Sequence, residues 1–441
     1  MSKEIISWVK EQFKDSKDFT QKTLEIDHKL ALMFYVVTQV DSEAIQKSII
    51  KPFFEMPTEQ HFKAYIQSLI QTKTVPSKEQ LIVALTSGNV LTVIGNELFL
   101  LELPKVHNAD VQDNKLESTI HGSQLGLSEN LSTNINVLRH NYHNASLMVE
   151  HLSAGMLNHM KLAIIYDKEK VNEEVLKRMK EKISKNDKQL IQTSDQLLNF
   201  MNNSKFALFP LLLLTERTDR IIYNIAGGKV AIVMDGTPHA IIGPTVFFDF
   251  MTSMEDNYHS FWIVQFVKLL RYLGLLTCIL LPGLYVGTTS YSPEVFRTEL
   301  ALTIAGSRTG VPYPSFVEVL LMLFFMELLL EASIRLPKAV SATATTVGGL
   351  VLGTAATEAA LASNIMIILV SAVAISTFVI PMNEMSFAMR IVRLVLLLFA
   401  SLFGLEGLML SFLGLILYMT NLNSFGEPYL RFYNYRKRKE S

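Results

Sequence analysis

The chain has 441 residues, of which 49% are hydrophobic and 18% are charged, and its formal net charge at pH 7 is −1. A chain with so little net charge, and with no basic stripe interleaved with aromatic residues before its C-terminus, is not expected to bind nucleic acid. Its single cysteine, Cys278, excludes an intrachain disulfide and any cysteine-pair metal site.

The composition divides the chain into two parts. Charged residues concentrate in residues 1–258, and apolar runs dominate residues 259–420. This division predicts an α+β membrane protein, in which a soluble α/β region precedes an all-α multi-pass transmembrane domain. The first thirty residues contain repeated Lys, Glu and Asp and no apolar core of signal-peptide length, so we expect the N-terminal region to stay on the cytosolic side.

A helix-plus-hairpin pattern occurs twice in the soluble region. In the first copy a helical pattern ends before Gly88, and two apolar strand patterns then flank a Gly-Asn turn. At an offset of 140 residues, Leu85, Gly88, Val90, Val93, Gly95-Asn96 and Pro104 correspond to Ile225, Gly228, Val230, Val233, Asp235-Gly236 and Pro244. We therefore expect two related helix-plus-hairpin subdomains, residues 1–115 and 116–258. The alternative is that any helix followed by a glycine-turn hairpin looks alike.

Between the two copies, residues 162–166 predict a short buried strand, and residues 172–183 have apolar positions at helical spacing. Residues 206–214 are apolar but are interrupted by Pro210. They are too few to cross a bilayer as a helix, which takes about 20 residues. This segment is expected in the core of the second subdomain.

The membrane region is expected to begin with an interfacial amphipathic helix at residues 259–271, where Trp262 is typical of a membrane surface. Residues 272–422 then predict a multi-pass transmembrane domain of five or six segments. The segments are residues 272–289, 316–330, 345–361, 365–380 and 391–422, the last of them interrupted at Gly404-Leu405-Glu406-Gly407. Residues 423–441 are expected to form a basic cytosolic tail.

Lys and Arg near the ends of membrane segments favour the cytosolic side. Six crossings with both termini in the cytosol place every basic cluster there and leave Arg297 and Arg308 outside. The clusters are Lys268/Arg271, Arg335/Lys338, Arg390/Arg393 and Arg431 with Arg436-Lys437-Arg438-Lys439. The halves of the last segment are short for full spans, so tilting or partial insertion is the alternative.

Long ordered motifs in residues 150–430 resemble the A-subunit family of GerA-type spore nutrient-germinant receptors. They include Thr215-Glu216-Arg217-Thr218-Asp219-Arg220, Phe247-Phe248-Asp249-Phe250, Ala305-Gly306-Ser307-Arg308-Thr309-Gly310, Glu331-Ala332-Ser333-Ile334-Arg335-Leu336-Pro337 and Ser376-Thr377-Phe378-Val379-Ile380-Pro381. The resemblance implies a receptor in the spore inner membrane, with a permease-like B subunit that senses the nutrient and a lipoprotein C subunit. It also implies a homo-oligomer, a ring of A subunits that contacts membrane lipid and releases ions.

Three glutamates lie in or beside the second segment, where an ionisable side chain is costly and suggests a function. Glu327 is the candidate permeation or gating carboxylate, and an interhelical hydrogen bond is its alternative. Glu318 is a second pore candidate, for which solvation near the start of the segment is the alternative. Glu331 lies four residues before Arg335, the helical spacing of a structural ion pair.

A stripe of small and hydroxyl residues lies in the third segment. Thr346, Gly349, Gly353 and Thr357 fall on one face of a helix and are candidates to line a narrow water-filled path. Gly349 and Gly353 also form a Gly-x-x-x-Gly motif, so close packing of helices is the alternative.

No catalytic, metal or cofactor site is expected. The ten His are scattered, and Gly227-Gly228-Lys229 lacks the first glycine and the hydroxyl residue of a phosphate-binding loop. Arg139, His140 and His143 are interpreted as a solvated helix face. The leading function is therefore an oligomeric, nutrient-gated ion channel or signalling core. The alternatives are a non-conducting membrane scaffold and a transporter with its own substrate site.

Overall fold

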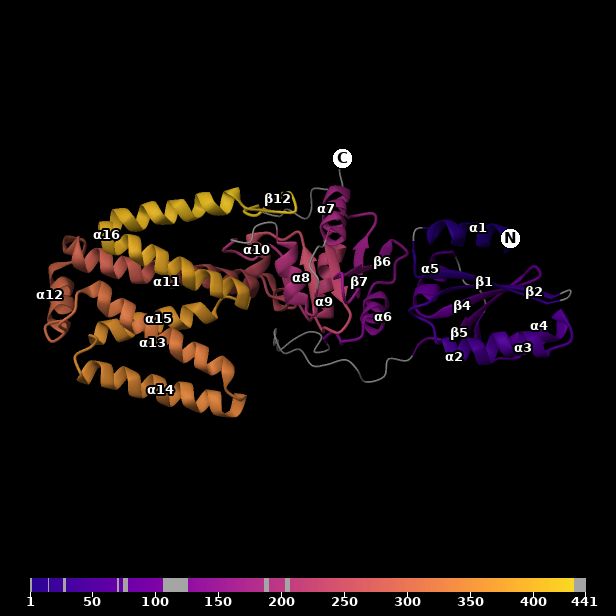
Figure 1. Ribbon diagram of the computed structural model, residues 1–441, viewed down its shortest axis with the longest axis horizontal. Coiled ribbons are helices and arrows are strands. Elements are labelled where there is room, and N and C mark those ends of the chain that lie inside the picture. The colour runs from indigo at the N-terminus through magenta and orange to yellow at the C-terminus, as the bar shows by residue number, and fades with distance from the viewer. Residues whose placement is uncertain are drawn as a thin grey trace.

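Two five-stranded antiparallel sheets and a bundle of long helices follow one another along the chain and along the longest axis of the molecule (Figure 1). The computed structural model describes residues 2–14, 16–26, 29–69, 71–73, 78–105, 126–185, 190–202 and 207–431. The expected boundary at residue 115 and the basic residues 436–439 lie outside these ranges.

The first sheet has the strand order β1-β2-β4-β5-β3. Apolar side chains alternate along its strands, so helices α2 to α4 cover one face and α1 and α5 cover the other. The elements are α1 (Ser2–Gln12), β1 (Phe19–Ile26), β2 (Lys29–Val36), α2 (Ser42–Ile45), the π-helix η1 (Gln46–Ile50), α3 (Lys51–Glu55), α4 (Glu59–Ser68), β3 (Thr72–Lys73), α5 (Lys78–Thr86), β4 (Asn89–Ile94) and β5 (Glu97–Glu102).

The second sheet has the order β6-β7-β9-β10-β8, which is the order of the first sheet once the strands are matched in sequence. Helices α7 and α8 cover one face, and α6 and α9 cover the other. The elements are α6 (Leu131–Asn141), β6 (Leu147–Ala154), β7 (Met160–Asp167), α7 (Glu173–Ser184), α8 (Ser194–Met201), β8 (Leu213–Thr215), α9 (Thr218–Ala226), β9 (Val230–Met234) and β10 (Ala240–Gly243).

Both hairpins predicted at the 140-residue offset are present, β4–β5 and β9–β10. The glycine before each hairpin has a positive φ, +92° at Gly88 and +84° at Gly228. A Cβ would lie 2.7 Å from the carbonyl oxygen of Gln39 at the first position and 2.5 Å from that of Lys170 at the second. Each carbonyl belongs to the third residue after the second strand of its sheet, so the two turns are built alike.

This geometry predicts a specific effect of Gly228→Ala. An alanine here would have to adopt a left-handed backbone conformation, and its Cβ would clash with the carbonyl oxygen of Lys170. We therefore expect Gly228→Ala to lower the free energy of unfolding by about 2 kcal/mol. Gly236 is the matched control, because its φ is +76° but nothing lies within 4 Å of a Cβ there. Gly236→Ala should lower the free energy of unfolding by about 1 kcal/mol, because only the backbone conformation is unfavourable there. Hydrogen exchange of the β9 amides in the full chain measures both losses, and equal losses would show that the carbonyl contact is irrelevant.

A buried ion pair joins the turn before β1 of the first sheet to helix α6, which covers the second sheet. Arg139 of α6 donates from Nη2 to Asp18 Oδ1 at 2.6 Å and from Nε to Oδ2 at 2.7 Å. Gln39 Nε2 also donates to the carbonyl oxygen of Asn136 at 3.1 Å. The Arg139 side chain is 0% exposed, so the interpretation of this residue as part of a solvated helix face is wrong.

The helical part begins with the short helices α10 (Phe247–Phe250) and η2 (Met254–Asn257) and contains three helices long and apolar enough to cross a membrane. The three are α11 (Phe261–Ser290), residues 340–358 of α14 (Lys338–Glu358), and α16 (Asn383–Asn421). The remaining elements are η3 (Pro293–Val295), α12 (Thr298–Ser307), α13 (Ser315–Arg335), α15 (Asn364–Phe378), β11 (Asn423–Ser424) and β12 (Glu427–Pro428).

Among the described residues the structure thus provides three candidate spans, where the sequence predicted five or six. Helix α15 is too short to be a candidate span, because it has only 15 residues. Helix α13 is not counted because it contains three glutamates, Glu318, Glu327 and Glu331. The expected interfacial helix at residues 259–271 and the first span are one continuous helix, α11. The helix continues through Arg271, Gly274 and Pro282, so its amphipathic start and its apolar remainder are not separate elements.

Helix α16 doubles back on itself at Gly404, so the last apolar stretch is a helical hairpin (Figure 1). Phe403 and Gly404 have non-helical dihedral angles, and Gly404 adopts a φ of +62° that suits glycine. A Cβ on Gly404 would lie 2.9 Å from the side chain of Tyr291, just after the end of α11. The predicted interruption at residues 404–407 therefore reverses the chain.

The chain after α16 returns to the second sheet. Ser424 Oγ donates to the carbonyl oxygen of Leu211 at 2.6 Å. The backbone amide of Phe247 donates to the carbonyl oxygen of Tyr429 at 2.9 Å. Tyr429 is fully buried. Residues 423–431 thus pack on the second sheet region through Ser424, Phe425 and Tyr429 instead of forming a free tail, and residues 432–441 lie outside the described part of the chain.

Candidate functional site

Glu327 joins α13 to α16 through two arginines. Its Oε1 accepts from Arg393 Nη2 at 2.5 Å, and its Oε2 accepts from Arg390 Nη1 at 3.2 Å. The side chain of Arg393 is completely buried. Both carboxylate oxygens are therefore engaged within the chain, as the predicted alternative of an interhelical contact requires.

Donors remain on these arginines. Within the described part of the chain, the buried Nε atoms of Arg390 and Arg393 have no hydrogen-bond partner. The Arg393 Nη1 atom lies 3.9 Å from the sulfur of Cys278 on α11. The cluster thus ties α13, α16 and α11 together at one level of the bundle.

Glu318 is fully buried, so the alternative of a solvated carboxylate does not hold, and its role as a pore candidate stays a prediction. Its Oε1 accepts from the backbone amide of Ser363 at 2.7 Å and from Ser363 Oγ at 2.8 Å, and its Oε2 accepts from Arg308 Nε at 3.2 Å. Ser363 is the N-cap of α15, so Glu318 fixes the start of that helix against α13. Glu318 and Glu327 have different partners, as the half-turn offset between them predicts.

The Glu331–Arg335 contact expected from helical spacing is present, with 2.6 Å between Glu331 Oε1 and Arg335 Nη2. Both side chains are exposed, so the pair contributes little to stability. It lies on the last turns of α13.

The stripe of small residues on α14 has no partner within the described chain. A Cβ on Gly349 or Gly353 would meet nothing within 4 Å. The hydroxyl groups of Thr346 and Thr357 donate to carbonyl oxygens of their own helix. Only 6% of the span at residues 340–358 is buried, compared with 44% for α11.

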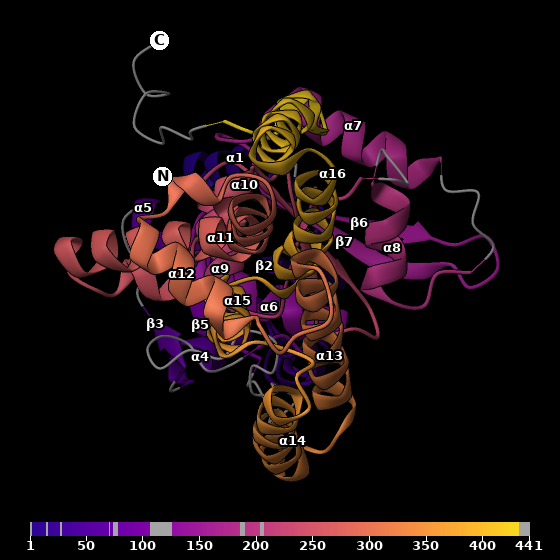
Figure 2. The same cartoon turned by 90° about the vertical axis from the view of Figure 1, so that its left-hand side faces the viewer.

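The structure does not bring Glu327 and the α14 stripe together. Figure 2 shows α14 at the outer edge of the bundle, with α13 between it and α16. The contacts of Glu327 point to α16, and α14 packs on α13 through other residues, such as Gly348 against Leu329.

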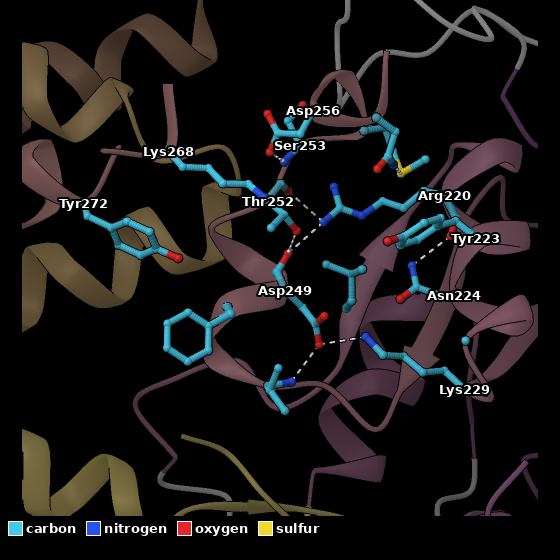
Figure 3. Close-up of a pocket in the computed structure, with 16 residues that line it drawn as sticks. Arg220, Tyr223, Asn224, Lys229, Asp249, Thr252, Ser253, Asp256, Lys268 and Tyr272 are labelled. Carbon is cyan, nitrogen blue, oxygen red and sulfur yellow. Dashed lines mark hydrogen bonds and ion pairs between the residues drawn. The ribbon is translucent and has the colours of Figure 1, made fainter. Parts of the chain in front are cut away.

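A pocket of about 530 Å³ that the sequence did not predict lies where the second sheet meets α11. Figure 3 shows Arg220 and Lys229 on one side of it and Lys268 and Tyr272 of α11 on the other, with Asp249 between them. The only signal in the sequence was that several of these residues fall in the motifs of the family resemblance, which assigned them no role.

Ion pairs and hydrogen bonds hold the charged side chains of the pocket wall in place. Lys229 Nζ lies 2.7 Å from Asp249 Oδ2, and Arg220 Nη2 donates to the carbonyl oxygens of Asp249 at 3.0 Å and Thr252 at 3.3 Å. Burial lowers the pKa of Lys229, and the nearby Arg220 lowers it further, whereas Asp249 opposes the shift. In the described chain, no group of three or more His, Cys, Asp or Glu is placed to hold a metal ion.

The comparison that decides the family covers nearly the whole chain. The family described as Bacillus/Clostridium GerA spore germination protein matches residues 7–440. This chain belongs to the GerA spore germination protein family. Two relatives are spore germination protein KA of Bacillus subtilis (strain 168), 31% identical over 96% of this chain, and spore germination protein GerLA of Bacillus cereus, 34% identical over 71%. The aligned part spans 80% of the length of the first relative and 64% of the second.

One solved structure also aligns with this GerA-family chain. It is the crystal structure of the N-terminal domain of the A subunit of the Bacillus megaterium spore germinant receptor GerK3. The alignment covers 55% of this chain and 94% of that domain, with 19% sequence identity and a TM-score of 0.40. Membership of the GerA family, rather than this alignment, supports a role in spore germination.

Proposed function

We propose that this GerA-family chain is the A subunit of a spore nutrient-germinant receptor, and that several copies surround an ion path that opens when the nutrient is sensed. The observation that carries the proposal is the open face of α14. An apolar span that is only 6% buried, with Gly349 and Gly353 facing open space, suits packing against a helix of a second copy. Family membership supplies the link to germination.

The partners belong to the same proposal. A permease-like B subunit would sense the nutrient, a lipoprotein C subunit would complete the complex, and the soluble region and C-terminus would face the cytosol of the spore. Arg271 supports this orientation, since basic residues near the ends of membrane helices favour the cytosolic side. Arg271 lies on the part of α11 next to the second sheet, where it pairs with Asp256 at 2.6 Å. The shared strand order of the two sheets supports an internal duplication of the soluble region.

A non-conducting scaffold is the second candidate. The observation in its favour is Glu327, whose two oxygens contact Arg390 and Arg393 instead of facing an open path. On either account Glu327 is proposed to stabilise the bundle, and the hydroxyl and glycine face of α14 is the remaining candidate for the path.

Gly353→Leu tests the proposed assembly. Leucine should keep the two helices from close approach and reduce the oligomer population about tenfold, which corresponds to about 1.4 kcal/mol. Ala355→Leu is the matched control, because Ala355 is exposed but lies on a different side of α14 from Gly353. Crosslinking in spore membranes measures the oligomer, and nutrient-triggered germination measures the function. Equal behaviour of the two variants would contradict a role for this face.

A further inference from the structure

The pocket between the second sheet and α11 lies beside the first turns of a helix that is long and apolar enough to cross a membrane. Helix α11 enters the bundle with apolar and aromatic side chains turned outward, including Trp262, which is 81% exposed, and the exposed Phe261 and Phe266. Aromatic residues of this kind lie at the level of lipid headgroups. Lys268 and Tyr272, about two and three turns after Trp262 on the same helix, line the pocket. The pocket is therefore within reach of a headgroup.

The charges of the lining favour an anion. Asp249 is paired with Lys229 at 2.7 Å, and Asp256 is paired at 2.6 Å with Arg271, which does not line the pocket. Lys268 makes no ion pair with any residue that the structure describes, and its side chain is only partly exposed. A negatively charged group bound in the pocket would therefore neutralise the positive charge of Lys268.

The remaining walls indicate the rest of the ligand. Phe248 and Tyr272 lie edge to face, with ring centroids 6.4 Å apart, and Val246 adds a further apolar wall. A pocket of about 530 Å³ is large enough for a phosphate group with a short glycerol portion. Lysine binds phosphate as a compact point charge, and anionic lipids concentrate such groups at the cytosolic surface.

We propose that this pocket binds the phosphate of an anionic phospholipid headgroup, with Lys268 as its main charged contact. The apolar wall formed by Phe248 and Tyr272 would hold the glycerol portion next to the bilayer. Binding there would couple the second sheet to the first membrane helix, because the lining comes from both.

The test is a calorimetric titration of the purified full chain in a non-ionic detergent with dihexanoyl phosphatidylglycerol below its critical micelle concentration. Lys268→Gln should weaken binding about tenfold, since a hydrogen bond to a charged group is lost. Lys268→Arg should retain most of the affinity because it keeps the charge. Lys47→Gln is the control, because Lys47 is exposed and far along the chain in the first sheet region.

Three results would overturn the proposal. Equal binding of dihexanoyl phosphatidylcholine would show that the pocket does not select an anionic lipid. Binding of inorganic phosphate as tight as that of the lipid would identify a soluble phosphate as the ligand. Unchanged binding by Lys268→Gln would place the lipid elsewhere on the protein. Selective binding of the anionic lipid that is lost only in Lys268→Gln supports it.

Discussion

Replacing Arg139 by methionine is expected to destabilise the soluble region by about 3–5 kcal/mol, because the carboxylate of Asp18 would stay buried without its counter-ion. Arg139 contacts both oxygens of that carboxylate, and its Nη2 atom also donates to Ser16 Oγ at 3.0 Å. The two charged side chains are almost fully buried, so water cannot replace the lost contacts. Hydrogen exchange of the amides in β1 and α6 of the full chain measures the loss.

Two further variants separate the buried pair from general effects of charge removal. Lys47→Met breaks the exposed Lys47–Glu43 pair, which is worth at most about 1 kcal/mol. The double variant Asp18→Leu/Arg139→Met removes both buried charges and should recover most of the stability. A double variant as unstable as Arg139→Met alone would show that lost packing, rather than an unpaired carboxylate, causes the defect.

The second large effect is expected for Glu327→Gln, which should destabilise the helical bundle by about 3 kcal/mol. Glutamine keeps the shape but leaves Arg393 fully buried without a counter-charge from α13. The contact between α13 and α16 would weaken, and the amount of folded protein in spore membranes should fall. Thermal unfolding of the purified full chain in detergent measures the change.

Glu331→Gln is the matched control, since Glu331 lies one turn further along α13 and its pair with Arg335 is exposed. It should change stability by less than about 1 kcal/mol. A different outcome would restore Glu327 as a permeation carboxylate: normal stability and assembly of Glu327→Gln, together with altered ion release.

The two hairpins of the soluble region were predictable because their signals are local. Gly88 and Gly228 mark turns that need a positive φ, and the apolar alternation after them defines each hairpin. The pairing of the hairpins into sheets with β1, β2 and β6, β7 depends on contacts across long stretches of chain, and the sequence has no local signal for it.

The membrane region was harder to predict for a physical reason. Apolar segments show where the helices are, but α11 continues through Arg271 and also through Pro282, so no local signal shows that the interfacial segment and the first span form one helix. The burial of Glu318 depends on Ser363, which is 45 residues away in the chain. The pocket at α11 combines residues from Leu213 to Tyr272, so no single motif reveals it.

The most direct measurement of the central claim is ion flux across liposomes that contain the purified receptor, with its partner subunits present and the nutrient added. We expect a nutrient-dependent flux that is lost in Gly353→Leu and retained in Ala355→Leu. An assembled receptor that binds nutrient but conducts no ions would contradict the channel and favour the scaffold.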